Sequence, residues 1–146
     1  MRNYVDRHTG RYIHDRLNDA KTSAWICSPY IDKKYLDMLI DLAGGNIDVR
    51  LITTNRQTGY NVREYLKQNQ NNLNSFQPLI LTGDDYVHAK LYIIDDDCAI
   101  EGSVNLTSNG LWNQPNYVHI HDSQDEVKII KDTFNRIWNY NSNPKK

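Results

Sequence analysis

The side chains best suited to catalysis lie together in one stretch, HAKLYIIDDDCAIEGSVN, which begins at residue 88. Near neutral pH a histidine such as His88 can act as a nucleophile, a base or an acid. Lys90 adds a positive charge that can hold a phosphate and stabilise charge developing on it. Further along, Ser103 offers a hydroxyl and Asn105 offers amide donors. These residue types suit phosphoryl chemistry.

A β-hairpin would bring these side chains together. The segment KLYIIDDDCAIEG predicts two short strands joined tightly at 95–97, since aspartate tolerates turn geometry. Side chains two apart on a strand share a face, so His88 and Lys90 form a pair. Because the turn lies midway along the stretch, the second strand returns Gly102 and Ser103 beside His88. Gly102 there lets a ligand approach the backbone.

The remaining elements predict an α/β fold: a mixed, largely parallel β-sheet flanked by helices on both faces. Apolar spacing predicts helices over 5–22, 33–43 and 61–73. Short apolar or alternating runs predict strands over 23–28, 48–54, 77–83 and 116–122. An amphipathic C-terminal helix follows, with an apolar side formed by Val127, Ile130, Phe134, Ile137 and Trp138.

Length and composition are those of one globular domain spanning residues 1–146. Hydrophobic residues make up 39% and charged residues 24% of the chain, ordinary values for a folded soluble protein. No apolar run approaches the length of a membrane span, and the start of the chain lacks a secretory signal. Cys27 and Cys98 both lie in apolar segments, where a free thiol behaves as a small buried hydrophobe, and a disulfide between them stays open. We therefore expect a cytoplasmic protein.

At this point the residues match a known pattern. His88-x-Lys90, four residues, Asp95, six residues and Gly102-Ser103-x-Asn105 resemble the signature of the phospholipase D superfamily. Several fixed residue types at fixed spacing, on a predicted strand-turn-strand, make the match specific. AWICSPYID is similar to the first strand and turn of that superfamily, and NLTSNGLWNQPN to the stretch after its Gly-Ser.

The resemblance implies a phosphodiesterase that uses neither metal nor cofactor. His88 would attack phosphorus and form a phosphohistidine, while a second histidine protonates the leaving oxygen and then activates water. Lys90 and Asn105 would hold the phosphate oxygens with help from Ser103, and Asp95 would be a positioning residue. This chain has no second His-x-Lys. A homodimer in which each copy contributes His88 to one shared site is therefore expected.

One position departs from the family pattern. Many members carry a downstream Asn-x-Glu whose carboxylate orients the catalytic histidine, whereas this chain has Asn116, Tyr117 and Val118. Either Glu101 or Asp122 replaces that carboxylate, or the site is slow or partly degenerate.

A nuclease cleaving DNA or RNA is the leading hypothesis. The net charge of −1 gives no global attraction for a polyanion, so binding must rely on a local groove. The candidate residues are Lys90, Arg56, Arg63, Lys33 and Lys34. A separate specificity or helicase subunit is one source of selectivity, and no membrane partner is expected.

Other functions remain open at this stage. The chain is alternatively a phosphodiesterase of phospholipids or small diesters, or a non-catalytic nucleic-acid-binding module, which Val118 favours. His119, His121 and Asp122 are a weaker metal-site candidate, since no third His or Cys accompanies them at zinc-like spacing. A Ser103, His88 and Asp95 hydrolase is disfavoured, because His88 and Asp95 face opposite sides of a strand and no nucleophile elbow is present. Trp112 either stacks on a base or belongs to the core.

Overall fold

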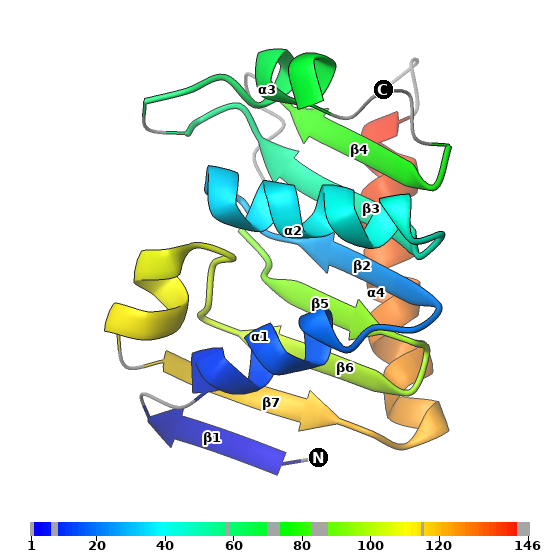
Figure 1. The fold of residues 1–146 in the computed structure, drawn as a ribbon. Coiled ribbons are helices and arrows are strands. Elements are labelled where there is room, and N and C mark those ends of the chain that lie inside the picture. The colour runs from blue at the N-terminus through cyan, green and yellow to red at the C-terminus, as the bar shows by residue number, and fades with distance from the viewer. Residues whose placement is uncertain are drawn as a thin grey trace.

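A seven-stranded mixed sheet forms the centre of the molecule, in a computed structural model that describes residues 2–6, 9–57, 59–69, 74–82, 88–114 and 116–142. The strand order is β1-β7-β6-β5-β2-β3-β4 (Figure 1). The strands are β1 Arg2–Asp6, β2 Ser23–Cys27, β3 Asp48–Thr54, β4 Phe76–Leu81, β5 Leu91–Ile94, β6 Cys98–Gly102 and β7 Asn116–His121.

Helices cover both faces of this sheet, as the sequence predicts. They are α1 Thr9–Asn18, α2 Lys33–Gly44, α3 Val62–Asn69 and α4 Gln124–Ser142, together with a short π-helical turn, η1, at Asn109–Asn113. In Figure 1, α1 and α2 cross one face and α4 crosses the other. The sheet buries two apolar layers accordingly. One contains Ile13 of α1, Leu36 of α2 and Leu66 of α3, and the other contains Val127 and Phe134 of α4.

Parallel pairing is less extensive than the element order suggested. Within the described residues, only β2 with β3 and β3 with β4 run parallel. The pairs β2–β5, β5–β6, β6–β7 and β1–β7 are antiparallel. The β-α-β-α-β start predicted the parallel half correctly. Strand β5 already runs antiparallel to β2, and the pairs that follow it in the sheet are all antiparallel.

The N-terminal helix predicted over 5–22 is partly wrong. Residues 2–6 form β1, which pairs with β7 at the edge of the sheet, and α1 is confined to Thr9–Asn18. The helical spacing of Ile13 and Leu17 is real, because both are fully buried. The spacing gave no indication of β1, because the strand that pairs with β1 lies more than a hundred residues away in sequence. The other predicted strands and helices are present within a few residues of their expected ends, while residues 70–73 and 83 of two of them lie outside the described residues.

The β5–β6 turn has a backbone conformation that suits aspartate. Asp95 and Asp96 both have a φ of 58°, and the Asp97 N–H donates to the Ile94 carbonyl at 3.3 Å. These are the features of a tight hairpin turn in which both central residues are left-handed. Aspartate tolerates that conformation better than most residues, which explains the aspartate run.

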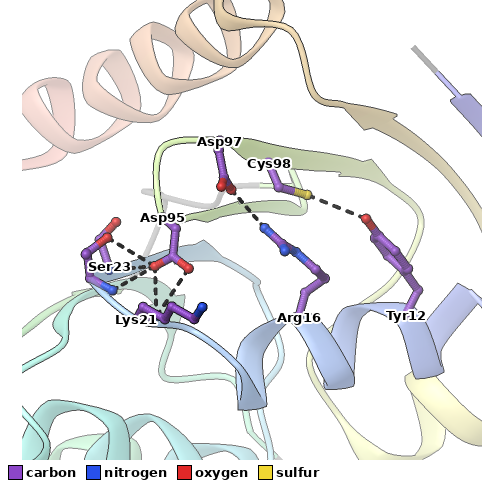
Figure 2. Close-up of polar contacts among 8 residues, drawn as sticks. Tyr12, Arg16, Lys21, Ser23, Asp95, Asp97 and Cys98 are labelled. Atoms are coloured by element: carbon purple, nitrogen blue, oxygen red, sulfur yellow. Dashed lines mark hydrogen bonds and ion pairs between the residues drawn. The ribbon is translucent and has the colours of Figure 1, made fainter.

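Asp95 also ties this turn to the start of β2. Its carboxylate accepts hydrogen bonds from the backbone N–H groups of Lys21, Thr22 and Ser23 at 2.8–3.2 Å (Figure 2). Its own N–H donates to the Ser23 carbonyl. Burial alone would raise the pKa of Asp95, but these donors outweigh burial and hold the pKa below its usual value. The charged carboxylate is therefore part of the fold.

Helix α1 reaches the same turn through two further side chains. Arg16 Nη2 donates to Asp97 Oδ1 at 2.9 Å, and the Tyr12 hydroxyl lies 3.9 Å from Cys98 Sγ (Figure 2). The Asp97 side chain is 70% accessible, against 32% for Arg16, and an ion pair with one partner so exposed contributes little to stability. The firm link between turn and sheet is Asp95.

None of the helices in the described ranges combines the length and apolar character needed to cross a bilayer.

Replacing Asp95 with alanine should lower the free energy of unfolding by about 1–3 kcal/mol, because three backbone N–H groups lose a charged acceptor and alanine is strained at positive φ. Urea denaturation followed by circular dichroism measures this loss. Asp97→Ala in the same turn is the matched control, expected to cost at most about 1 kcal/mol. Equal losses in the two variants would contradict the role given to Asp95.

Candidate active site

A cavity of about 410 Å³ opens where β5, β6 and β7 lie side by side. Leu91 pairs with Glu101, and Glu101 pairs with His119, so the three strands present one continuous edge. The cavity is lined by His88, Ala89, Lys90, Leu91, Glu101, Gly102, Ser103, Tyr117 and His119. The hairpin therefore brings His88, Lys90 and Ser103 to one place, as the sequence predicts.

Lys90 is held in a position suited to an anion. Its Nζ donates to the backbone carbonyl of His88 at 3.1 Å. Partial burial lowers the pKa of Lys90, and the neighbouring Cys27 opposes that effect only in part. Among the described residues no carboxylate forms an ion pair with this ammonium group. Its positive charge is thus incompletely solvated and available to a phosphate.

Cys27, beneath Lys90, takes no part in this chemistry. Burial raises the pKa of Cys27 to about 12, and the charge of Lys90 lowers it only in part. The thiol therefore stays protonated and donates to the Ala89 carbonyl at 3.5 Å. Both Cys27 and Cys98 are free and buried, and they belong to the two opposite apolar layers. The disulfide that the sequence left open is not formed.

Ser103 is fixed by the neighbouring strand. The Tyr117 N–H donates to Ser103 Oγ at 3.1 Å, and the Ser103 N–H donates to the Tyr117 carbonyl at 3.0 Å. The hydroxyl is thus held at the cavity wall while His88 is exposed beside it. The imidazole, the ammonium and the hydroxyl therefore share the lining of one cavity.

Gly102 serves strand packing as well as the cavity. A Cβ at this position would lie 2.2 Å from the Tyr117 carbonyl oxygen and 2.8 Å from the Val118 Cα. Such distances are far inside van der Waals contact, so only glycine fits. From the sequence we expected a ligand in this space, whereas the backbone of β7 occupies it.

Asn105 lies next to the cavity but is not part of its lining. Its Oδ1 accepts from Ser28 Oγ at 3.4 Å, and Ser28 Oγ in turn accepts from the Leu106 N–H at 2.9 Å. The Asp32 carboxylate accepts from the Ser108 N–H at 2.7 Å. The loop after β6 is thereby attached to the loop after β2. The Ser28 hydroxyl lies closer to the Tyr30 carbonyl, at 2.6 Å, and the Nδ2 amide of Asn105 can donate to a ligand.

Asp95 lies at the opposite end of β5 from the cavity. Its bonds to the start of β2 account for it, and it does not meet His88. The weak Ser103, His88 and Asp95 hydrolase hypothesis has no geometric support, because its acid is at the wrong end of the strand.

Val118 stands where the family has a glutamate, but its side chain cannot orient His88. It is 1% exposed and packs in the apolar layer beneath α1 and α2. Of the two substitutes considered from sequence, Glu101 lines the cavity and Asp122 does not. The Glu101 carboxylate lies 3.7 Å from His121 Nε2, and His121 Nδ1 is 3.0 Å from Glu126 of α4.

Tyr117 and His119 are lining residues that the sequence argument did not assign to the phosphate site. His119 Nε2 lies 2.9 Å from the Tyr117 hydroxyl, with the two rings edge to face. The alternation in NYVHIH could have indicated these residues. It places Tyr117, His119 and His121 on one face of the strand and the buried Val118 and Ile120 on the other. No group of three metal-ligating side chains occurs in the part of the chain that the structure describes, so the metal hypothesis for His119 and His121 has no further ligand.

The remaining candidates from sequence lie away from the cavity. The Lys33 ammonium lies over the rings of Tyr60 and Tyr65, and Arg63 Nη2 donates to the Ile80 carbonyl. Of the five expected groove residues, only Lys90 lines the cavity. Trp112 is neither a core residue nor a free surface for base stacking. The residue is 40% exposed, and its indole N–H donates to the Tyr35 hydroxyl at 3.0 Å.

The fold and this cavity define a phospholipase D-like domain. The profile of the family described as "Cardiolipin synthase, PLD-like domain" matches residues 13–138, and the chain belongs to this family. The superfamily resemblance seen in the sequence is thus confirmed, and the superfamily's members process phosphodiesters.

Relatives with curated names are larger proteins. Cardiolipin synthase 1 of Bacillus anthracis is 26% identical over 127 residues, which are 81% of this chain and 24% of that protein. The mitochondrial cardiolipin hydrolase of Canis lupus familiaris is 34% identical over 53 residues, 36% of this chain and 21% of that protein. This chain spans about a quarter or less of the length of these relatives.

Solved structures share the fold at low identity. NucT from Helicobacter pylori superposes with a TM-score of 0.72 at 16% identity, and the match covers 94% of each chain. Nuc from Salmonella typhimurium, a phospholipase D family member, gives a TM-score of 0.73 at 18% identity, again over 94% of each chain.

Replacing Gly102 with alanine should destabilise the protein by about 1–3 kcal/mol, because the added methyl forces β6 and β7 apart. Thermal unfolding compared with Gly44→Ala is the test. No heavy atom lies within 4 Å of a Cβ at Gly44, so that helical substitution should be neutral or slightly stabilising. If Gly102→Ala is as stable as Gly44→Ala, the contact between the strands does not require glycine.

Proposed function

We propose that this protein is a metal-independent endonuclease that cleaves DNA or RNA through a covalent phosphohistidine on His88. The observation that carries the proposal is the convergence of His88, Lys90 and Ser103 on one cavity. Family membership supports the phosphodiester chemistry. The choice of nucleic acid over lipid rests on the side chains that line the cavity, most of which carry a polar or charged group.

The reaction divides into two displacements. An imidazole nitrogen of His88 attacks phosphorus, the bond between phosphorus and the leaving oxygen breaks, and a second histidine gives that oxygen a proton. The second histidine then removes a proton from water, which attacks phosphorus and releases His88. Lys90, Ser103 and the Asn105 amide stabilise the charge on the non-bridging oxygens.

The second histidine is supplied by another copy of the chain. The superfamily mechanism uses two His-x-Lys motifs, and this sequence carries one. A two-fold axis beside the exposed His88 would place the same residue of both copies at one phosphate, since the surface around such an axis is shared by both subunits. The proposed setting is the cytoplasm, which the two free thiols favour.

Phospholipid cleavage is the second candidate, because the curated relatives are named for cardiolipin synthesis and hydrolysis. A lipid substrate needs an apolar surface for its acyl chains. Ala89 and Leu91 are the aliphatic side chains among the described lining residues, and two such side chains offer little surface to acyl chains. A module that binds nucleic acid without cutting it is the remaining alternative.

A cleavage panel in excess chelator tests the proposal. Wild-type protein should cut labelled plasmid, single-stranded DNA or RNA with undiminished rate, because no step requires a metal. His88→Ala should lose at least about a thousandfold in rate, as removing a covalent nucleophile does.

Asp122→Asn is a control for folding and surface charge, since Asp122 is not in the cavity lining; its rate should match that of the wild type. Loss of activity in chelator would contradict the metal-free mechanism. Cleavage of cardiolipin vesicles with no cleavage of nucleic acid would transfer the proposal to lipids, and binding without any cleavage would leave the non-catalytic module.

A further inference from the structure

The cavity is larger than one phosphate requires. At about 410 Å³ it falls within the roughly 300–1,000 Å³ of pockets that hold small organic ligands. His88, Lys90 and Ser103 account for one end. Tyr117, His119 and Glu101 account for the other, and the proposed chemistry assigns no role to Tyr117 and His119.

Two of these residues form an aromatic wall. The Tyr117 and His119 rings lie 4.9 Å apart, nearly perpendicular, and are joined by the bond between the hydroxyl and Nε2. Tyr117 remains 48% exposed. Its only polar side-chain atom is engaged by His119, so the accessible ring surface is apolar. Together with Ala89 and Leu91, this surface suits a flat, partly apolar group that stacks.

Glu101 is the one acidic residue among the described residues that line the cavity. It is the cross-strand partner of His119, and its side chain is 38% exposed. Its contact with His121 is 3.7 Å long, beyond hydrogen-bond range. At that distance the carboxylate is not committed to a hydrogen bond with His121 and can accept donors from a ligand. A carboxylate here repels a second phosphate and accepts N–H groups.

From this arrangement we propose that the Tyr117, His119 and Glu101 end of the cavity binds an unpaired guanine adjacent to the scissile phosphate. The Watson–Crick edge of guanine presents two neighbouring donors, N1–H and the N2 amine, which the two oxygens of Glu101 can accept together. Adenine and cytosine present one amine at that edge, and thymine presents a single N–H between two carbonyls. The edge is free only in single strands, so the subsite favours single-stranded substrate.

A cationic lipid headgroup fits the same cavity less well. A quaternary ammonium needs several aromatic faces around it, and Tyr117 is the only phenylalanine, tyrosine or tryptophan among the described lining residues. The bidentate acceptor is more useful to guanine than to a cation without N–H groups.

This subsite rests on the proposed nuclease function, but its first test is independent of catalysis. Binding of deoxyguanosine monophosphate and thymidine monophosphate to the wild-type protein is measured by NMR titration in chelator. The guanine nucleotide should bind roughly tenfold tighter or more, in line with the discrimination of one bidentate contact. Glu101→Gln keeps the shape but replaces one acceptor with a donor, and should remove most of that advantage while leaving thymidine monophosphate within about twofold.

Glu126→Gln is the matched control. Glu126 contacts the same His121 but does not line the cavity, so the guanine preference should persist in this variant. If Glu126→Gln loses the preference as Glu101→Gln does, the effect comes from the charge of His121 and the subsite is wrong. Equal binding of the two nucleotides, or tighter binding of phosphocholine than of the guanine nucleotide, also overturns it.

Cleavage of a single-stranded DNA of randomised sequence supplies the second test. Cut sites should be enriched for guanine at one fixed side of the broken bond, and Glu101→Gln should flatten that enrichment. Uniform cutting overturns the subsite and leaves the nuclease proposal intact. Guanine-selective, Glu101-dependent binding without any cleavage overturns the nuclease proposal and supports the subsite.

Discussion

The register of the β5–β6 hairpin is the constraint on which the rest of the site depends. The Asp95 carboxylate, held by three backbone N–H groups, fixes the turn against the start of β2. A slip of one residue would turn every side chain of the hairpin to the opposite face. With the register set, Leu91 faces Glu101 and the two ends of the motif meet. Asp95 therefore acts on the site from the far end of a strand, through geometry and not through contact.

Strand β7 extends this arrangement and requires glycine at position 102 of β6. Because Gly102 has no side chain, β7 approaches β6 closely, and the backbone of Tyr117 fixes the Ser103 hydroxyl. The same approach places the Tyr117 and His119 side chains at the cavity. Asn105 is positioned in a different way. It lies in a loop that hydrogen bonds of Ser28 and Asp32 attach to the β2–α2 connection. Site geometry is thus set by strand pairing on one side and by loop contacts on the other.

Much of this could be predicted from sequence, for identifiable reasons. The hairpin could be predicted because alternation, aspartate turn chemistry and the spacing from His88 to Ser103 are all local signals. Strand β1 was not, since the partner that makes Arg2–Asp6 a strand is β7. The strand parity of NYVHIH indicated which residues share a face, but not that this face borders the motif. The role of Gly102 was misjudged because sequence does not show which atoms occupy the space where its side chain would be.

We propose that these elements build half of a catalytic site. In this proposal one chain supplies one nucleophile, one ammonium group and one hydroxyl, and a second histidine at the same phosphate comes from another copy. The most direct measurement of this claim mixes wild-type protein with increasing proportions of His88→Ala under conditions of subunit exchange, at constant total concentration. A shared site predicts that cleavage falls with the square of the wild-type fraction, because mixed dimers are inactive. Cleavage that falls in simple proportion to the wild-type fraction would contradict it, since each chain would then carry a complete site of its own.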